Sequence, residues 1–102
     1  MSADNQDLRR AWAVSVSRTA TVLAQHDPAS IAEGKPDPAG EYKSEAEELV
    51  RYLCMGPALP EAAEIVRRVL GDGFGPGFEI AADDLDRLTR DLLGAVQLPS
   101  SS

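Results

Sequence analysis

The sequence predicts an all-α protein, a single-domain bundle of about four helices with a long proline-rich connection between the first two. Apolar residues recur at helical spacing in four segments, and no segment has convincing strand alternation. Aromatic residues make up only 5% of the chain, so Leu, Val, Ile and Ala must build the core. Because 102 residues suit one domain, we place the domain at 1–98 and expect a disordered tail at 99–102.

The first helix is predicted from an apolar stripe with a period of 3.6 residues. Asp4, with Asp7 three residues later, is the expected N-cap, since both place negative charge at the positive end of the helix dipole. We expect the helix to end near residues 25–26, because Pro28 disfavours helical geometry at the residue before it. The stripe consists of Leu8, Ala11, Trp12, Ser15, Val16, Thr19, Val22 and Leu23.

The connection after the first helix cannot itself be helical. Pro28, Pro36 and Pro38 remove backbone donors and favour extended geometry before them, while Gly34 and Gly40 permit positive φ. Long ordered loops are often functional, so we expect this connection either to bind a partner or to be locked in place without a ligand.

We expect a specific way of locking this loop. Tyr42 can pin the loop to the bundle, and either Asp27 or Glu45 can accept backbone hydrogen bonds from it. The prolines restrict the unfolded chain, so ordering the connection costs less free energy than its length suggests.

The second helix is expected to begin at about Glu45. Ser44 and Glu47 have the spacing of a capping box, and Gly56 followed by Pro57 should stop the helix. We expect an exposed ion pair between Glu47 and Arg51, which are four residues apart.

The third helix should begin at Pro60 and end before Gly71. The following run, 71–78, is too rich in glycine to predict a regular element, and its two phenylalanines, Phe74 and Phe78, should tuck back under the bundle.

The fourth helix carries an apolar face and two expected exposed ion pairs. The pairs join Asp83 to Arg87 and Asp86 to Arg90. The apolar face consists of Ala81, Leu85, Leu88, Leu92 and Val96.

The charge of the chain limits its partners. The net charge of −7 and the pI near 4.5 disfavour sequence-independent binding to nucleic acid and to anionic membranes. Residues 27–48 hold seven acids against two lysines, a local balance of −5, so an electrostatically steered partner should be basic.

The residues with reactive side chains favour structural roles. His26 should lie against the negative end of the first helix, and Cys54 between two apolar residues should be a buried small hydrophobe. Neither has the partners of a catalytic or metal site, so we expect no enzyme activity, no metal and no cofactor. One cysteine excludes an internal disulfide and no apolar N-terminal run is present, which predicts a cytoplasmic protein.

One enzymatic alternative remains open. Carboxylates on the second and fourth helices have the residue types that hold magnesium in all-helical nucleotide pyrophosphatases. Arg51 occupies the position where such a site would have a third acid, and a solvated polar face also explains the carboxylates. The residues concerned are Glu45, Glu47, Glu48, Asp83, Asp84 and Asp86.

Several motifs between residues 20 and 95 resemble a family of small, uncharacterised, all-helical bacterial proteins. That family has an Asp-Pro, Gly-x-Pro and Asp-Glu-Tyr signature between its first two helices, and the resemblance implies an all-α fold and an important loop, with no established activity. The matching residues are Asp27-Pro28, Ile31, Gly34-Lys35-Pro36, Glu41-Tyr42, Glu45, Leu49, Leu53 and the segment 63–66. Pro38-Ala39-Gly40 stands where the family has a contiguous acidic pair before Glu41.

These observations favour a non-enzymatic protein-binding module, such as an acidic immunity-type inhibitor or a regulatory adaptor, over two alternatives. One is the magnesium-dependent hydrolase, and the other is a purely structural homodimer that buries Val14 or the fourth helix. The candidate residues for partner binding or loop locking are Asp27, Pro28, Gly34, Pro36, Glu41, Tyr42, Glu45 and Glu48.

Overall fold

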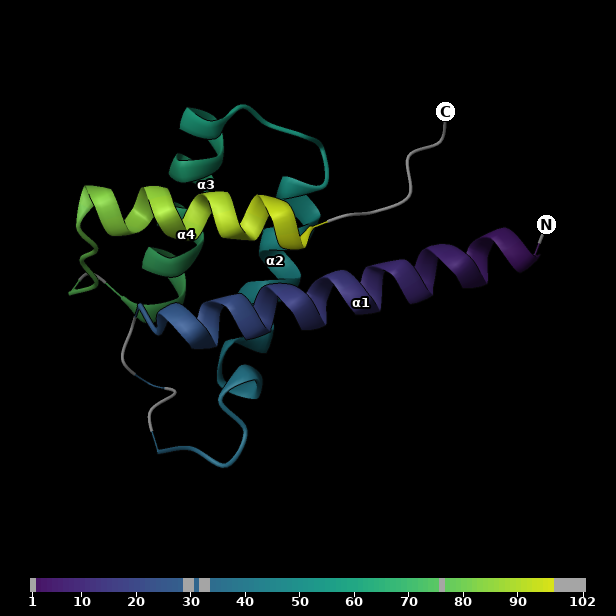
Figure 1. Cartoon of the computed structure of the whole chain (residues 1–102), viewed down its shortest axis with the longest axis horizontal. Helices are drawn as coiled ribbons and strands as arrows, with labels where there is room; N and C mark the ends of the chain where they lie inside the picture. The colour runs from purple at the N-terminus through teal and green to yellow at the C-terminus, as the bar shows by residue number, and fades with distance from the viewer. Residues whose placement is uncertain (1, 29–30, 32–33, 76, 97–102) are drawn as a thin grey trace.

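The computed structural model of the chain describes residues 2–28, 31, 34–75 and 77–96. Within these residues the fold is all-α, with four α-helices, one short 3₁₀ helix and no strand, which confirms the predicted fold class (Figure 1). The elements are α1 (Ser2–His26), η1 (Ala39–Tyr42), α2 (Lys43–Leu53), α3 (Leu59–Phe74) and α4 (Ala82–Ala95). The expected tail at 99–102 lies outside the described residues.

The helices enclose one apolar core. α1 and α3 each pack against both α2 and α4, and η1 packs against α1 and α2. Burying one leucine or valine fully contributes about 1.5–3 kcal/mol, so the core side chains outweigh the low helix propensity of individual positions. The fully buried apolar side chains include Leu23, Leu49, Val50, Val66, Leu70, Leu88 and Leu92.

α1 is the longest helix and extends past the rest of the bundle. Its 25 residues span about 37 Å at 1.5 Å per residue, against about 21 Å for the 14 residues of α4. Figure 1 accordingly shows the N-terminal part of α1 projecting beyond α2 and α4. The expected N-cap at Asp4 is wrong, because residues 2–7 contain neither glycine nor proline and the helix already includes Ser2.

The start of α2 also differs from the prediction. The helix begins at Lys43, directly after η1, and no side chain caps it, so the expected capping box of Ser44 and Glu47 is wrong. The backbone N–H of Lys43 donates to the carbonyl of Gly40, which belongs to η1. The preceding 3₁₀ turn thus supplies an acceptor for a backbone donor at the helix start, as short 3₁₀ segments often do at helix ends.

α3 extends through part of the glycine-rich run. It includes Gly71 and ends at Phe74, and Gly75 follows with a φ of 91°. Each glycine costs a helix about 1 kcal/mol relative to alanine, but continuing the helix places the Phe74 ring against the core. This ring makes edge contacts with Tyr42, at a centroid distance of 5.7 Å, and with Phe78, at 6.0 Å. Both phenylalanines pack against the core, as expected.

The exposed ion pairs are only partly as predicted. Arg90 pairs with Asp86 at 3.1 Å, whereas within the described chain no ion pair joins Asp83 to Arg87 or Glu47 to Arg51. Exposed pairs of long side chains gain little free energy over their solvated states, so sequence spacing alone does not decide whether they form.

Two expected burials are wrong. Cys54 is exposed, because α2 ends at Leu53 and the next two residues form an outward turn in which the Cys54 Sγ donates to the carbonyl of Arg51. Ala81 is likewise exposed, since it is the N-cap of α4 rather than part of its apolar face.

Candidate functional site

The proline-rich loop begins with an aspartate in an unusual backbone conformation. Asp27 has a φ of 45°, and its N–H donates to the carbonyl of Leu23 at 2.7 Å, which closes the end of α1. Aspartate tolerates the left-handed region better than most residues, and Pro28 prevents the helix from continuing through this position.

The Asp27 carboxylate joins the two ends of the loop. Its Oδ1 accepts a hydrogen bond from the backbone N–H of Ile31, at 2.9 Å, and another from the hydroxyl of Tyr42, at 2.7 Å. Tyr42 is fully buried, and its ring lies edge-on to Phe74. Hydrogen bonds to an ionised acceptor contribute about 1.5–3 kcal/mol each, so this three-residue contact fixes the loop to the bundle.

Glu45 has a different environment from the other loop and α2 carboxylates. It is half-buried against α3, where a Cβ added to Gly73 would lie 2.8 Å from its Oε2. Gly73 thus leaves room for the Glu45 side chain, which lies against α3 and is less exposed than Glu41, Glu47 and Glu48.

The remaining candidate residues divide by exposure. Gly34, Pro36, Glu41 and Glu48 are exposed, whereas Pro28 is half-buried. Gly34 has a φ of 77°, a conformation that strains residues with a side chain, so a glycine is required at this bend. The candidate residues therefore form an inner group that holds the loop and an outer group that faces solvent.

A groove lies between α1 and the end of the loop. It has a volume of about 440 Å³ and contains the half-buried Trp12, the chain's only tryptophan. Asp37 stands at its edge and accepts a hydrogen bond from the N–H of Gly40 at 3.2 Å. The lining residues are Trp12, Ala13, Val16, Ser17, Ala20, Asp37, Ala39, Gly40, Lys43 and Glu47.

Sequence reasoning missed this groove. Trp12 belongs to the predicted apolar stripe and does pack against the core, but it is only half-buried and also lines the groove. The available signal for an ordered turn was the spacing of Asp37 and Gly40, because an aspartate side chain can accept a hydrogen bond from a backbone N–H a few residues later.

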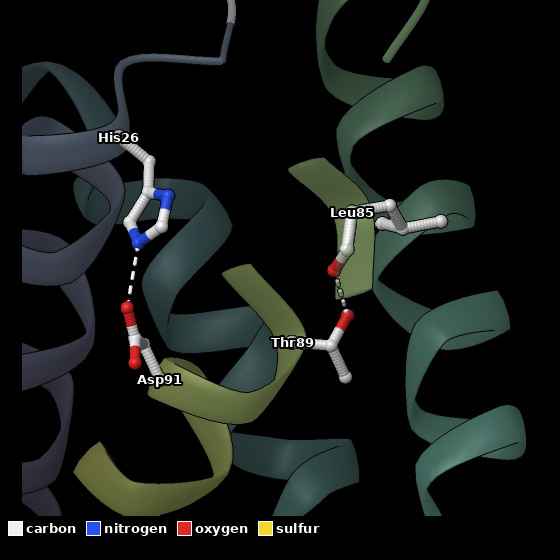
Figure 2. Close-up of polar contacts among 4 residues, drawn as sticks. All are labelled: His26, Leu85, Thr89 and Asp91. Carbon is white, nitrogen blue, oxygen red and sulfur yellow. Dashed lines mark hydrogen bonds and ion pairs between the residues drawn. The ribbon is translucent and has the colours of Figure 1, made fainter. Parts of the chain in front are cut away.

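His26 lies in the last turn of α1, as expected, and also has a partner that the sequence did not indicate. Figure 2 shows its Nε2 facing Asp91 of α4, with 2.8 Å between Nε2 and Oδ2. The Asp91 side chain is 60% exposed, so this contact is a surface link between α1 and α4 and contributes at most about 1 kcal/mol.

The described residues contain neither a cluster of metal ligands nor a helix that could cross a membrane. Within the described chain, no three His, Cys, Asp or Glu side chains lie close enough together to hold a metal ion. No helix among the described residues has the length and apolar character needed to cross a membrane.

Comparisons with protein families, with curated proteins and with solved structures find no match to this chain. The resemblance to the small all-helical bacterial family therefore stays a prediction.

Proposed function

We propose that the protein is a non-enzymatic binding module that holds a basic protein on an acidic surface formed by Asp37, Glu41, Glu47 and Glu48. All four carboxylates are exposed, and they come from the end of the loop, η1 and the first half of α2. The observation that carries the proposal is the contact of Asp27 with Ile31 and Tyr42, which holds η1 and the loop end, and with them Glu41 and Asp37, beside the two glutamates of α2.

A fixed loop favours binding for a physical reason. A flexible acidic segment would lose conformational freedom when a partner binds, and that loss would weaken the complex. Here much of the ordering has already taken place on folding, through the buried Tyr42 and the left-handed Asp27. The net charge of −7 would in addition accelerate encounters with a positively charged partner.

This chemistry suits two kinds of cytoplasmic role. In an immunity-type inhibitor, the acidic surface would cover the basic site of a toxic protein. In a regulatory adaptor, it would hold a basic segment of a target protein. Both roles require the same recognition, exposed carboxylates opposite Lys and Arg side chains.

The test is affinity capture from native lysate with a loop-face variant, in which Glu41, Glu47 and Glu48 are changed to Gln. Glu45 is left unchanged because it packs against α3. We expect the wild-type protein to retain a basic partner that salt releases, and the loop-face variant to lose it.

The control is an α3 variant that carries Glu61→Gln, Glu64→Gln and Asp72→Asn. These three residues are exposed on α3. Both variants neutralise three carboxylates, so they change the net charge by the same amount. Equal capture by the two variants would show that total charge, and not the acidic surface, governs binding, and the proposal would be wrong.

A further inference from the structure

We infer that the groove beside Trp12 receives one amphipathic helix of the basic partner, with a bulky apolar side chain in the groove and Lys or Arg side chains against Asp37 and Glu47. This inference rests on the proposed function and specifies which part of the surface provides the specific contact.

The shape of the groove favours a helix over a compact ligand. Trp12, Val16 and Ala20 lie four residues apart along one side of α1, so the groove follows this helix for about 12 Å, or roughly two turns. Ala39 and Gly40 of η1 form the opposite wall. These small residues leave the space that an inserted apolar side chain needs.

The projecting part of α1 extends the contact surface. α2 and α4 pack on the C-terminal part of α1, while its N-terminal part continues past them (Figure 1). A helix lying in the groove can therefore continue alongside the part of α1 that no other described helix covers. Trp12 lines the groove and is half-buried against the core, and tryptophan is among the residues that most often dominate binding energy at protein interfaces.

The charges around the groove favour a basic occupant. Asp37 and Glu47 are exposed and outnumber Lys43, the other charged lining residue. The Asp37 carboxylate is held by the Gly40 N–H, and a Cβ at Gly40 would collide with this carboxylate. An acidic helix in the same place would meet two carboxylates and one lysine, whereas a helix with Lys or Arg beside its apolar face would pair with both carboxylates.

The probe is a synthetic amphipathic peptide of Leu and Lys at helical spacing, with a matched Leu and Glu peptide as the control. Trp12 is the only tryptophan in the chain, so its fluorescence reports directly on the groove. We expect the Leu and Lys peptide to shift the Trp12 emission to shorter wavelength in a saturable way, and the Leu and Glu peptide to cause no shift. Equal shifts with both peptides would overturn the charge argument.

Two lysine substitutions on α1 test the position. Ser17 is exposed and lines the groove, whereas Val14 is exposed on α1 but does not line it. Ser17→Lys fills the groove and adds a repelling charge, so we expect it to weaken the Leu and Lys peptide at least about tenfold. Val14→Lys should change the affinity by no more than about twofold, since it adds the same charge to α1 but outside the groove.

Equal weakening by Ser17→Lys and Val14→Lys would overturn the inference, because a general charge effect would then explain the binding. Circular dichroism and thermal melting of both variants verify that they fold.

If Ser17→Lys keeps the native partner and the loop-face variant loses it, the groove inference fails alone. If neither variant loses the partner, the proposed function fails as well. A concentration-dependent dimer that Ser17→Lys dissolves and Val14→Lys leaves intact would identify a second copy of this chain as the occupant of the groove and overturn the inference.

Discussion

Replacing Thr19 with valine should stabilise the protein. Thr19 is fully buried on α1, and its Oγ1 has no hydrogen-bond partner among the described residues. A buried polar group without a partner costs about 1–3 kcal/mol in lost hydration. Valine has nearly the same shape and a similar helix propensity, so Thr19→Val removes this cost while leaving the packing almost unchanged.

Thr89 provides a matched comparison on α4. It is also fully buried, but its Oγ1 donates to the carbonyl of Leu85 at 2.7 Å, as Figure 2 shows. Thr89→Val loses this hydrogen bond, so we expect it to lower the free energy of unfolding by about 0.5–1.5 kcal/mol. Thr19→Val should instead raise the free energy of unfolding by about 1 kcal/mol.

Urea unfolding at equilibrium, followed by circular dichroism, measures both effects. For a domain of this size, 1 kcal/mol corresponds to about 4–8 °C in Tm, so thermal melting provides an independent check. The slope of the urea transition should be unchanged in both variants, because neither changes the surface exposed on unfolding. The argument is refuted if Thr19→Val lowers the free energy of unfolding, as Thr89→Val is expected to do.

Three further predictions follow from the contacts of the loop, the surface and the carboxylates. Tyr42→Phe keeps the buried ring but removes the hydrogen bond to Asp27, so it should lower the free energy of unfolding by about 1.5–3 kcal/mol. It should also accelerate proteolysis within residues 28–41. Unchanged proteolysis would contradict the role of this hydrogen bond in locking the loop. His26→Gln should change stability by no more than about 1 kcal/mol in urea unfolding, since the Asp91 contact is exposed; a loss of several kcal/mol would contradict a surface role. Adding magnesium should neither raise Tm nor produce hydrolysis of nucleoside triphosphates, and turnover abolished by Glu48→Gln would instead favour the hydrolase.

The apolar periodicity predicted the fold class because the stripes are wide and regular. Leu49, Leu53, Leu85, Leu88 and Leu92 repeat at helical spacing, and each is buried. The helical period and the burial agree at these positions, because a helix with such an apolar stripe is stable only when the stripe packs against the core.

Helix ends were harder to predict, because several local signals compete there. Gly71 has the properties of a helix stop, but the packing of Phe74 against Tyr42 and the core continues α3 for three more residues. At Ser44, a valid capping pattern is not used, because η1 already supplies a backbone acceptor for the start of α2. In both cases tertiary contacts outweigh a local preference worth about 1 kcal/mol.

The candidate site was predictable only where residues are close in sequence or chemically distinctive. Tyr42 was expected to pin the loop and either Asp27 or Glu45 to accept its backbone hydrogen bonds; Asp27 is the acceptor, and the hydrogen bond from Tyr42 to Asp27 was not predicted. The groove depends on how α1 packs beside the loop end, η1 and α2, and the contact of His26 with Asp91 joins residues 65 positions apart. Such relations follow from the packing of α1 against α4 and η1, which no local pattern encodes.

The most direct measurement for the proposed function is the association rate of the captured partner, purified, with the loop-face variant and with the charge-matched α3 variant at several salt concentrations. If the acidic surface guides the partner, the rate for the loop-face variant should fall about tenfold or more at low salt, and the α3 variant should stay near wild type. The difference should shrink as salt rises above about 0.1 M, where the Debye length falls below about 10 Å. Equal rates for the two variants at every salt concentration would contradict binding through the acidic surface.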